Sequence, residues 1–153
     1  MVLTTHALTG AVIGKNVGNP LLIILLSTVF HFALDNLHHG EYLNQNSSLR
    51  KTWWKVVLDI LIGLGVIFSF IYFANLSGEK SFNILLGSFF SMFPDLLTFL
   101  YWKMEMKFLK PVIDFHSKIH RYPKFSKKRE WNFRNAVNDI IISLISICLL
   151  VSF

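Results

Sequence analysis

The chain alternates between long apolar runs and short polar segments. Four of the runs approach the roughly 20 residues that an α-helix needs to cross a bilayer. They cover residues 20–38, 53–76, 82–102 and 132–153. Two shorter helices are predicted at 3–17, which is rich in small residues, and at 111–120, where the pattern is amphipathic. We therefore predict a single all-α domain, residues 1–153: a polytopic transmembrane bundle of about four spans, a short N-terminal helix and a cytoplasmic amphipathic helix.

Two prolines indicate where the predicted helices begin, bend or end. Gly18-Asn19-Pro20 is a turn followed by a helix start, so the first two helices should form a hairpin. His6 and His31 lie at nearly equal distances from that turn, and a hairpin would place them level with each other. Pro94 lies inside the run at 82–102, where we expect it to kink or break the helix.

The composition agrees with a membrane protein. The 153 residues are 53% hydrophobic and 16% charged, with a mean hydropathy of +0.49, a combination that soluble domains rarely reach. The single cysteine, Cys148, excludes a disulfide framework and any metal site built from several cysteines.

The positive charge is concentrated beside the predicted spans. The formal net charge is +6, and ten of the fifteen lysines and arginines lie between Lys103 and Arg134. Basic residues next to spans mark the cytoplasmic side and bind anionic lipid headgroups, so we favour membrane lipids over nucleic acid as the partner. The loops at 39–52 and 103–131 are accordingly predicted to be cytoplasmic. The candidate headgroup-binding residues are Lys124, Lys127, Lys128 and Arg129.

The acidic side chains fall into two groups. All four glutamates lie in predicted loops, whereas Asp35, Asp59, Asp95 and Asp139 lie in apolar helices. With a helical rise of about 1.5 Å per residue, these aspartates reach similar depths below the cytoplasmic ends of their helices. A buried carboxylate needs a cation or an imidazolium partner, so we expect a shared site in one cytoplasm-facing layer.

A stripe of His31, Asp35 and His39 is the strongest element of that site, because residues four apart share one helix face. Histidine and aspartate without cysteine favour a divalent metal, Zn²⁺ first and Mn²⁺ or Fe²⁺ as alternatives. The predicted metal ligands are His6, His31, Asp35, His39, Asp95 and His116. The candidate catalytic residues are Asp59 and His120, and Asp59 or a histidine would be the general base.

Simpler roles compete with these assignments. Of His38 and His39, one could merely meet the dipole at a helix C-terminus. His116 and His120 could be surface residues of a headgroup-binding helix, and Asp139 could simply pair with Arg134 or cap polar backbone groups. The sequence has no His-Glu-x-x-His helix, Gly-x-Ser-x-Gly turn or phosphate-binding glycine loop, which disfavours metalloproteases and serine hydrolases.

Four short motifs resemble those of a known family. They are Thr5-His6-Ala7-Leu8-Thr9-Gly10, His31-Phe32-Ala33-Leu34-Asp35 followed by His38-His39-Gly40, Gly87-Ser88-Phe89-Phe90-Ser91-Met92-Phe93-Pro94-Asp95, and Phe115-His116-Ser117-Lys118-Ile119-His120-Arg121. In these motifs the chain resembles the small bacterial inner-membrane proteins known as membrane-bound metal-dependent hydrolases. The resemblance implies a bacterial inner-membrane location and a hydrolase activity, and it names no substrate. It also implies site residues, namely His6, His31, Asp35, Asp95, His116 and His120.

The residues and the resemblance together predict a membrane-bound metal-dependent hydrolase. Metal-activated water would attack a phosphoester of a lipid or of another membrane-associated substrate. One alternative is a proton or ion relay, or a transporter, that uses the same histidines and aspartates. The other is a structural membrane subunit in which the polar cluster only holds helices together. A relay should distribute its ionisable groups across the membrane, whereas here the outer half has few of them.

Overall fold

The computed structural model describes residues 1–43, 45–120, 126–127 and 130–152. Within these ranges the ordered elements are helices, with one isolated bridge between Glu41 and Glu130. The helices are α1 (Leu3–Asn16), α2 (Pro20–Asp35), α3 (Leu49–Phe73), α4 (Gly78–Lys103), the 3₁₀ helix η1 (Lys107–Leu109), α5 (Lys110–Ile119) and α6 (Phe133–Val151). The predicted all-α class is confirmed.

Three of these helices could cross a membrane. α3, α4 and α6 are long and apolar enough to do so. α2 has 16 residues, fewer than the roughly 20 of a perpendicular span, and it ends at Asp35 instead of the predicted residue 38. α3 and α4 each begin four residues earlier than predicted, at Leu49 and Gly78. Of the kink or break predicted at Pro94, the break does not occur: α4 continues as one helix through this residue.

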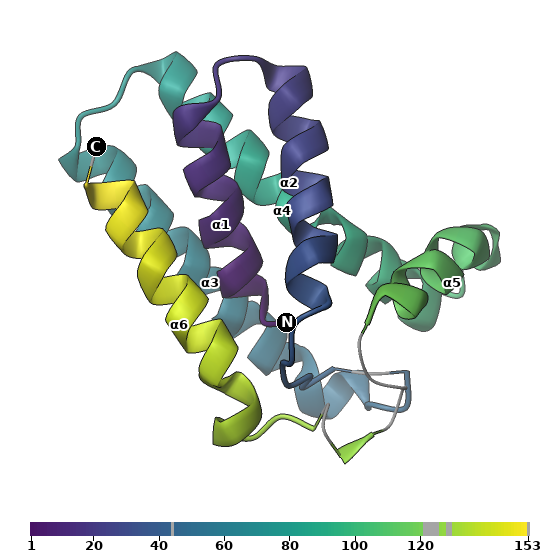
Figure 1. The fold of residues 1–153 in the computed structure, drawn as a ribbon. Helices are drawn as coiled ribbons and strands as arrows, with labels where there is room; N and C mark the ends of the chain where they lie inside the picture. The colour runs from purple at the N-terminus through teal and green to yellow at the C-terminus, as the bar shows by residue number, and fades with distance from the viewer. Residues whose placement is uncertain (44, 121–125, 128–129, 153) are drawn as a thin grey trace.

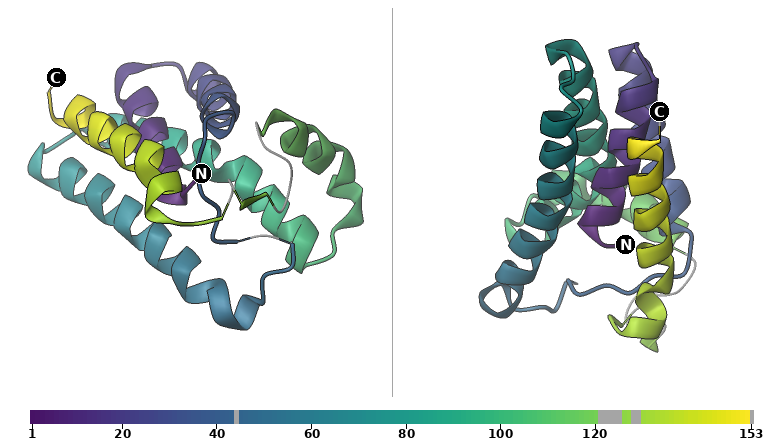
Figure 2. Two further views of the ribbon diagram at one scale, coloured as in Figure 1. Left: turned by 60° about the horizontal axis from the view of Figure 1, so that its bottom comes forward. Right: turned by 90° about the vertical axis from the view of Figure 1, so that its left-hand side faces the viewer.

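The short helix α1 lies at the centre of the bundle. Figure 1 shows it between α2 on one side and α6 on the other, with α4 crossing behind, and α1 packs against all four of α2, α3, α4 and α6. The views in Figure 2 place α5 to one side, against the C-terminal part of α4 and away from α3 and α6. Ala7, Leu8 and Ala11 of α1 form the apolar core with residues from α3, α4 and α6.

Glycines allow α1 and α4 to approach each other unusually closely. A Cβ atom added at Gly10 would overlap the carbonyl oxygen of Gly87, and one added at Gly87 would overlap the carbonyl oxygen of Gly10. Gly14, one turn later, meets the backbone of Asn83 in the same way. Small residues spaced four apart are a common means of bringing helix backbones together in membranes. The register of α1 on α4, and with it the height of His6 beside α4, is thus set by these glycines.

Carboxylates from two neighbouring helices cap the N-terminus of α1. The Asp59 carboxylate of α3 accepts hydrogen bonds from the backbone N–H groups of Leu3 (2.7 Å) and Thr4 (3.0 Å). Asp139 of α6 accepts one from Val2 N–H at 2.9 Å. The first N–H groups of a helix have no intrahelical acceptor, and negative charge there also meets the positive end of the helix dipole. These two aspartates therefore replace the cap that the α1 sequence lacks.

Replacing Asp59 with Ala should destabilise the fold, because it leaves two N–H groups of α1 without acceptors. We expect the free energy of unfolding in mild detergent to fall by about 1–3 kcal/mol. The matched control is Asp114→Ala, which removes an exposed pair with Lys110 and should cost less than about 0.5 kcal/mol. Equal unfolding curves for the two variants would show that the Asp59 cap contributes nothing.

Candidate metal centre

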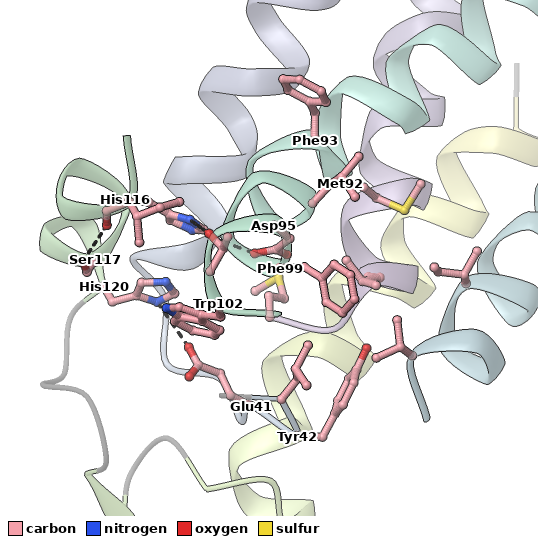
Figure 3. Close-up of a pocket in the computed structure, with 18 of the residues that line it drawn as sticks. Glu41, Tyr42, Met92, Phe93, Asp95, Phe99, Trp102, His116, Ser117 and His120 are labelled. Atoms are coloured by element: carbon pink, nitrogen blue, oxygen red, sulfur yellow. Dashed lines mark hydrogen bonds and ion pairs between the residues drawn. The ribbon is translucent and has the colours of Figure 1, made fainter. Parts of the chain in front are cut away.

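A cavity of about 400 Å³ lies between α3, α4, α5 and the segment at 41–43. Most of its lining is apolar, but Asp95, His116 and His120 line it together with Glu41 and Tyr42 (Figure 3). Asp95 comes from α4, and His116 and His120 come from α5 and the residue that follows it. The cavity therefore gives an outside molecule access to part of a larger cluster of histidines and aspartates.

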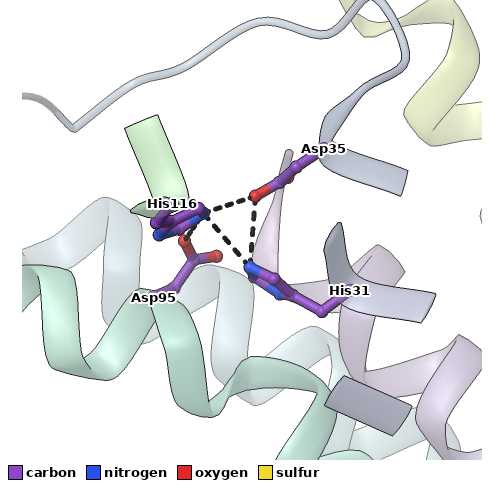
Figure 4. Close-up of side chains that lie close together, drawn as sticks. All are labelled: His31, Asp35, Asp95 and His116. Atoms are coloured by element: carbon purple, nitrogen blue, oxygen red, sulfur yellow. Dashed lines mark hydrogen bonds and ion pairs between the residues drawn. The ribbon is translucent and has the colours of Figure 1, made fainter. Parts of the chain in front are cut away.

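Asp35, the last residue of α2, is the centre of that cluster. It is fully buried, and five imidazoles have a nitrogen within 4.0 Å of its carboxylate (Figure 4 shows two of them with Asp95). The Nε2 atoms of His116, His31 and His120 lie 2.7, 3.1 and 3.6 Å from Oδ2. Those of His6 and His39 lie 3.2 and 3.9 Å from Oδ1, and the amino group of Met1 lies 3.3 Å from the same oxygen.

Asp95 provides a second carboxylate to the cluster. Its oxygens lie 3.8 Å from His6 Nε2 and 3.9 Å from His116 Nε2. His31, Asp35, Asp95 and His116 each place one ligand atom within 4.8 Å of the others, so together they could hold a metal ion. A second such group consists of Asp35, His39 and His120. Asp35 belongs to both groups and could bridge two ions.

The hydrogen bonds behind the histidines fix which nitrogen carries the proton. His31 Nδ1 lies 2.7 Å from the carbonyl oxygen of Ser91, which can only accept, so this nitrogen must donate. His39 Nδ1 lies 2.8 Å from the carbonyl oxygen of Leu37 and must donate as well. The Thr98 hydroxyl donates to the Pro94 carbonyl at 3.0 Å, so it accepts from His116 Nδ1 at 2.9 Å.

This arrangement leaves an unshared electron pair on Nε2 of each neutral ring, aimed at the Asp35 carboxylate. Nitrogen and oxygen acceptors then face each other at 2.7 Å for His116 and 3.1 Å for His31, which is repulsive unless a proton or a metal ion lies between them. Metal-binding histidines usually donate a hydrogen bond from the ring nitrogen that faces away from the metal, to a backbone carbonyl, a carboxylate or water. The Nδ1 atoms of these histidines likewise donate to a backbone carbonyl or, for His116, to a hydroxyl. Tetrahedral ligands about 2.0–2.1 Å from zinc lie about 3.3 Å apart, and His31 Nε2 and His116 Nε2 are 3.3 Å apart. The His116 Nε2–Asp35 Oδ2 distance of 2.7 Å is shorter than this separation, and the His116 Nε2–Asp95 Oδ1 distance of 3.9 Å is longer. The group could therefore hold a divalent metal ion once these side chains move by a few tenths of an ångström.

His6 joins the cluster across the α1–α2 hairpin. Its ring stacks on that of His31 with centroids 4.2 Å apart, so the prediction that the hairpin brings these two histidines level is confirmed. The ring is fully buried, and neither nitrogen has a hydrogen-bond partner among the described residues. His6 Nε2 nevertheless lies between the carboxylates of Asp35 and Asp95, so it is placed as a further candidate ligand.

Asp59 is not part of the cluster. Besides the cap on α1, its carboxylate accepts a hydrogen bond of 2.7 Å from the Tyr42 hydroxyl, and in the described part of the chain it has no ion pair with a clustered histidine. Burial and then the charge of Asp59 raise the pKa of the Tyr42 phenol, so this hydroxyl stays protonated and remains a donor. The geometry thus gives Asp59 a structural contact, and its predicted role as general base stays a prediction.

The structure describes one of the four predicted headgroup-binding residues. Lys127 is exposed, and its carbonyl oxygen accepts a hydrogen bond from the Asn135 side chain at 3.4 Å. Lys124, Lys128 and Arg129 lie outside the described residues.

Glu41 and Thr98 are among the contributors to the site that the sequence did not predict. Glu41 lies 3.7 Å from both His39 Nε2 and His120 Nδ1. It lies in a loop, as the sequence predicts, but the sequence does not single it out as a site residue. Its position two residues after His39 was a usable signal. Thr98 orients His116 from one turn beyond Pro94, and no pattern in the sequence singles it out.

Comparison with known proteins does not assign this chain to a family. No family model, no curated protein and no solved structure matches the chain.

Proposed function

We propose that this is an integral membrane protein whose His/Asp cluster holds a divalent metal, zinc in the first instance, and hydrolyses a phosphoester at the membrane. The observation that carries the proposal is the position of His31 Nε2 and His116 Nε2, which lie 3.1 and 2.7 Å from buried Asp35 Oδ2, beside a cavity. A bound divalent ion would lower the pKa of a water molecule and neutralise charge on a phosphoryl oxygen. Manganese or iron would suit the same ligands.

The proposal includes a location. We place the cluster on the cytoplasmic side of a bacterial inner membrane, with the basic segment 103–131 beside anionic headgroups. α3, α4 and α6 would be the spans, while α1 and the shorter α2 form a hairpin inside the bundle. The resemblance to metal-dependent hydrolases of that membrane agrees with this placement.

The chain's own residues would divide the work between binding and proton transfer. His31, Asp35, Asp95 and His116 would hold the ion, with Ser91 and Thr98 keeping the two rings oriented. His120 lines the cavity and is the candidate general base. Glu41, with an oxygen 3.7 Å from His120 Nδ1, would stabilise the imidazolium that forms when His120 takes a proton.

Hydrolysis can be tested on the purified full chain, loaded with zinc, manganese or iron, with p-nitrophenyl phosphomonoesters and phosphodiesters and with anionic phospholipid vesicles. We expect turnover by the wild type and a loss of about 10²–10⁴-fold in kcat for His120→Gln, the range typical of a removed general base. His38→Gln is the matched control, because His38 lies beside the site and belongs to neither ligand group.

Metal-loaded protein that turns over none of these phosphoesters would contradict the hydrolase proposal. If the same protein in liposomes instead conducts protons, and Asp35→Asn stops that flux, the relay is the correct function.

A further inference from the structure

The cavity beside the cluster has one polar end and apolar walls. Asp95, His116 and His120 are at the polar end. Val56 and Ile60 from α3 and Met92 from α4 contribute to the walls. A water-soluble substrate would gain nothing from such walls, whereas burying a hydrocarbon chain there is favourable in proportion to the apolar area covered. The cavity is therefore matched to a molecule with one charged end and one apolar end.

The size of the cavity limits how much hydrocarbon it can take. About 400 Å³ is near the lower limit for pockets that enclose a small ligand. It suits one chain beside a headgroup and is small for a lipid with two chains. The side chains that frame it along α4, from Phe89 through Met92 and Phe93 to Asp95, lead from the hydrocarbon region to the carboxylate over about 9 Å of helix.

Trp102 lies at the polar end of the cavity (Figure 3), two turns beyond Asp95 along α4. The indole lines the cavity next to His120 and Glu41 (Figure 3), and its Nε1 is buried without a hydrogen-bond partner among the described residues. Indole N–H is a donor only, and a buried donor without an acceptor is costly. An ester or phosphoryl oxygen at the headgroup would supply the acceptor that this nitrogen lacks.

We propose that the substrate is a single-chain amphiphile, a phosphoester whose headgroup lies at Asp95, His116 and His120 while its one apolar chain fills the cavity between α3 and α4. The identity of the headgroup rests on the proposed phosphoester hydrolysis. The placement of the substrate's apolar chain rests on the shape and lining of the cavity alone. Trp102 would donate to an oxygen of the headgroup and so set the depth to which the chain enters.

The test uses a homologous series of n-alkyl phosphonates, from ethyl to decyl, which resist hydrolysis and stay below their micelle concentration. Their dissociation constants are measured with the full chain in amphipol, both metal-free and zinc-loaded. We expect binding to tighten about fourfold for each added methylene until the cavity is full, and then to level off. Trp102→Phe should weaken every member of the series by a similar factor, about tenfold, because only the headgroup loses a hydrogen bond.

A matched pair of variants tests where the alkyl chain of the ligand lies. Val56 lines the cavity, whereas Val57, the next residue of α3, is 43% exposed on the outside of the bundle. Val56→Trp fills the space and should weaken decyl phosphonate by at least about tenfold, with little effect on ethyl phosphonate. Val57→Trp should behave as the wild type and so corrects for unspecific partitioning.

Affinity that is independent of chain length, or equal effects of Val56→Trp and Val57→Trp, would overturn the inference. The two proposals can fail separately. Length-dependent binding without any turnover supports the cavity assignment and contradicts the hydrolase. Turnover of soluble phosphoesters, combined with phosphonate binding that is independent of alkyl length, supports the hydrolase and contradicts the cavity assignment.

Discussion

Replacing Asp35 with Asn is expected to weaken metal binding strongly, whereas the wild-type protein should carry at least one equivalent of a divalent metal. Asn retains the shape of the side chain but removes the negative charge that faces five imidazole nitrogens. We expect zinc affinity to fall by more than about hundredfold. Loss of a group that is only hydrogen-bonded to a metal ligand already lowers metal affinity by about 10–100-fold, and Asp35 would be a ligand itself. Elemental analysis of detergent-purified protein, followed by competition with a chelator, measures both quantities.

Two further variants make the result specific. Thr98→Val keeps the volume but removes the hydroxyl that accepts from His116, and it should weaken zinc by about 10–100-fold. Asp114→Asn, an exposed carboxylate at the surface of α5, should leave metal content unchanged. If wild-type protein reconstituted with zinc, manganese or iron retains none of them, protons and not a metal lie between Asp35 and its histidines.

Adding one methyl group at Gly10 should be among the most destabilising changes in the chain. In Gly10→Ala the new Cβ would overlap the backbone of α4 at Gly87, which cannot move aside as a flexible side chain could. We expect a loss of at least about 2 kcal/mol in the free energy of unfolding, at the upper part of the range for overpacked cores. Because His6 is one turn before Gly10, any shift of α1 along α4 should also weaken metal binding.

The matched control is Gly65→Ala in α3, where a Cβ would meet no atom within 4 Å. Alanine is the better helix former, so this change should be neutral or stabilising by up to about 1 kcal/mol. Thermal denaturation followed by circular dichroism compares the two variants under one condition. A Gly10→Ala melting temperature equal to that of the wild type would show that the α1–α4 contact tolerates separation.

Three of the four aspartates that the sequence predicts to share one level meet at the start of α1. Asp35 faces Met1, Asp139 accepts from Val2, and Asp59 accepts from Leu3 and Thr4. All three thus meet the first turn of α1 or the residues just before it. Their common level follows from the rise per residue of the helices, which the sequence reveals. Asp59 and Asp139 cap α1, and among the described residues they belong to neither group that could hold a metal ion.

The sequence by itself determined the helical class, three of the four helices that it predicts to cross a membrane, the hairpin that brings His6 level with His31, and the role of Asp35 as a partner for histidines. These features follow from hydrophobic period, from proline and glycine chemistry and from counting residues along one helix or across one tight turn. The tertiary structure alone decided that Asp59 caps α1, that Glu41 joins His39 and His120, and that Thr98 orients His116. Each of those contacts depends on how helices rotate and pack against one another, which is fixed by close approaches such as Gly10 on Gly87 and has no signature within a single segment.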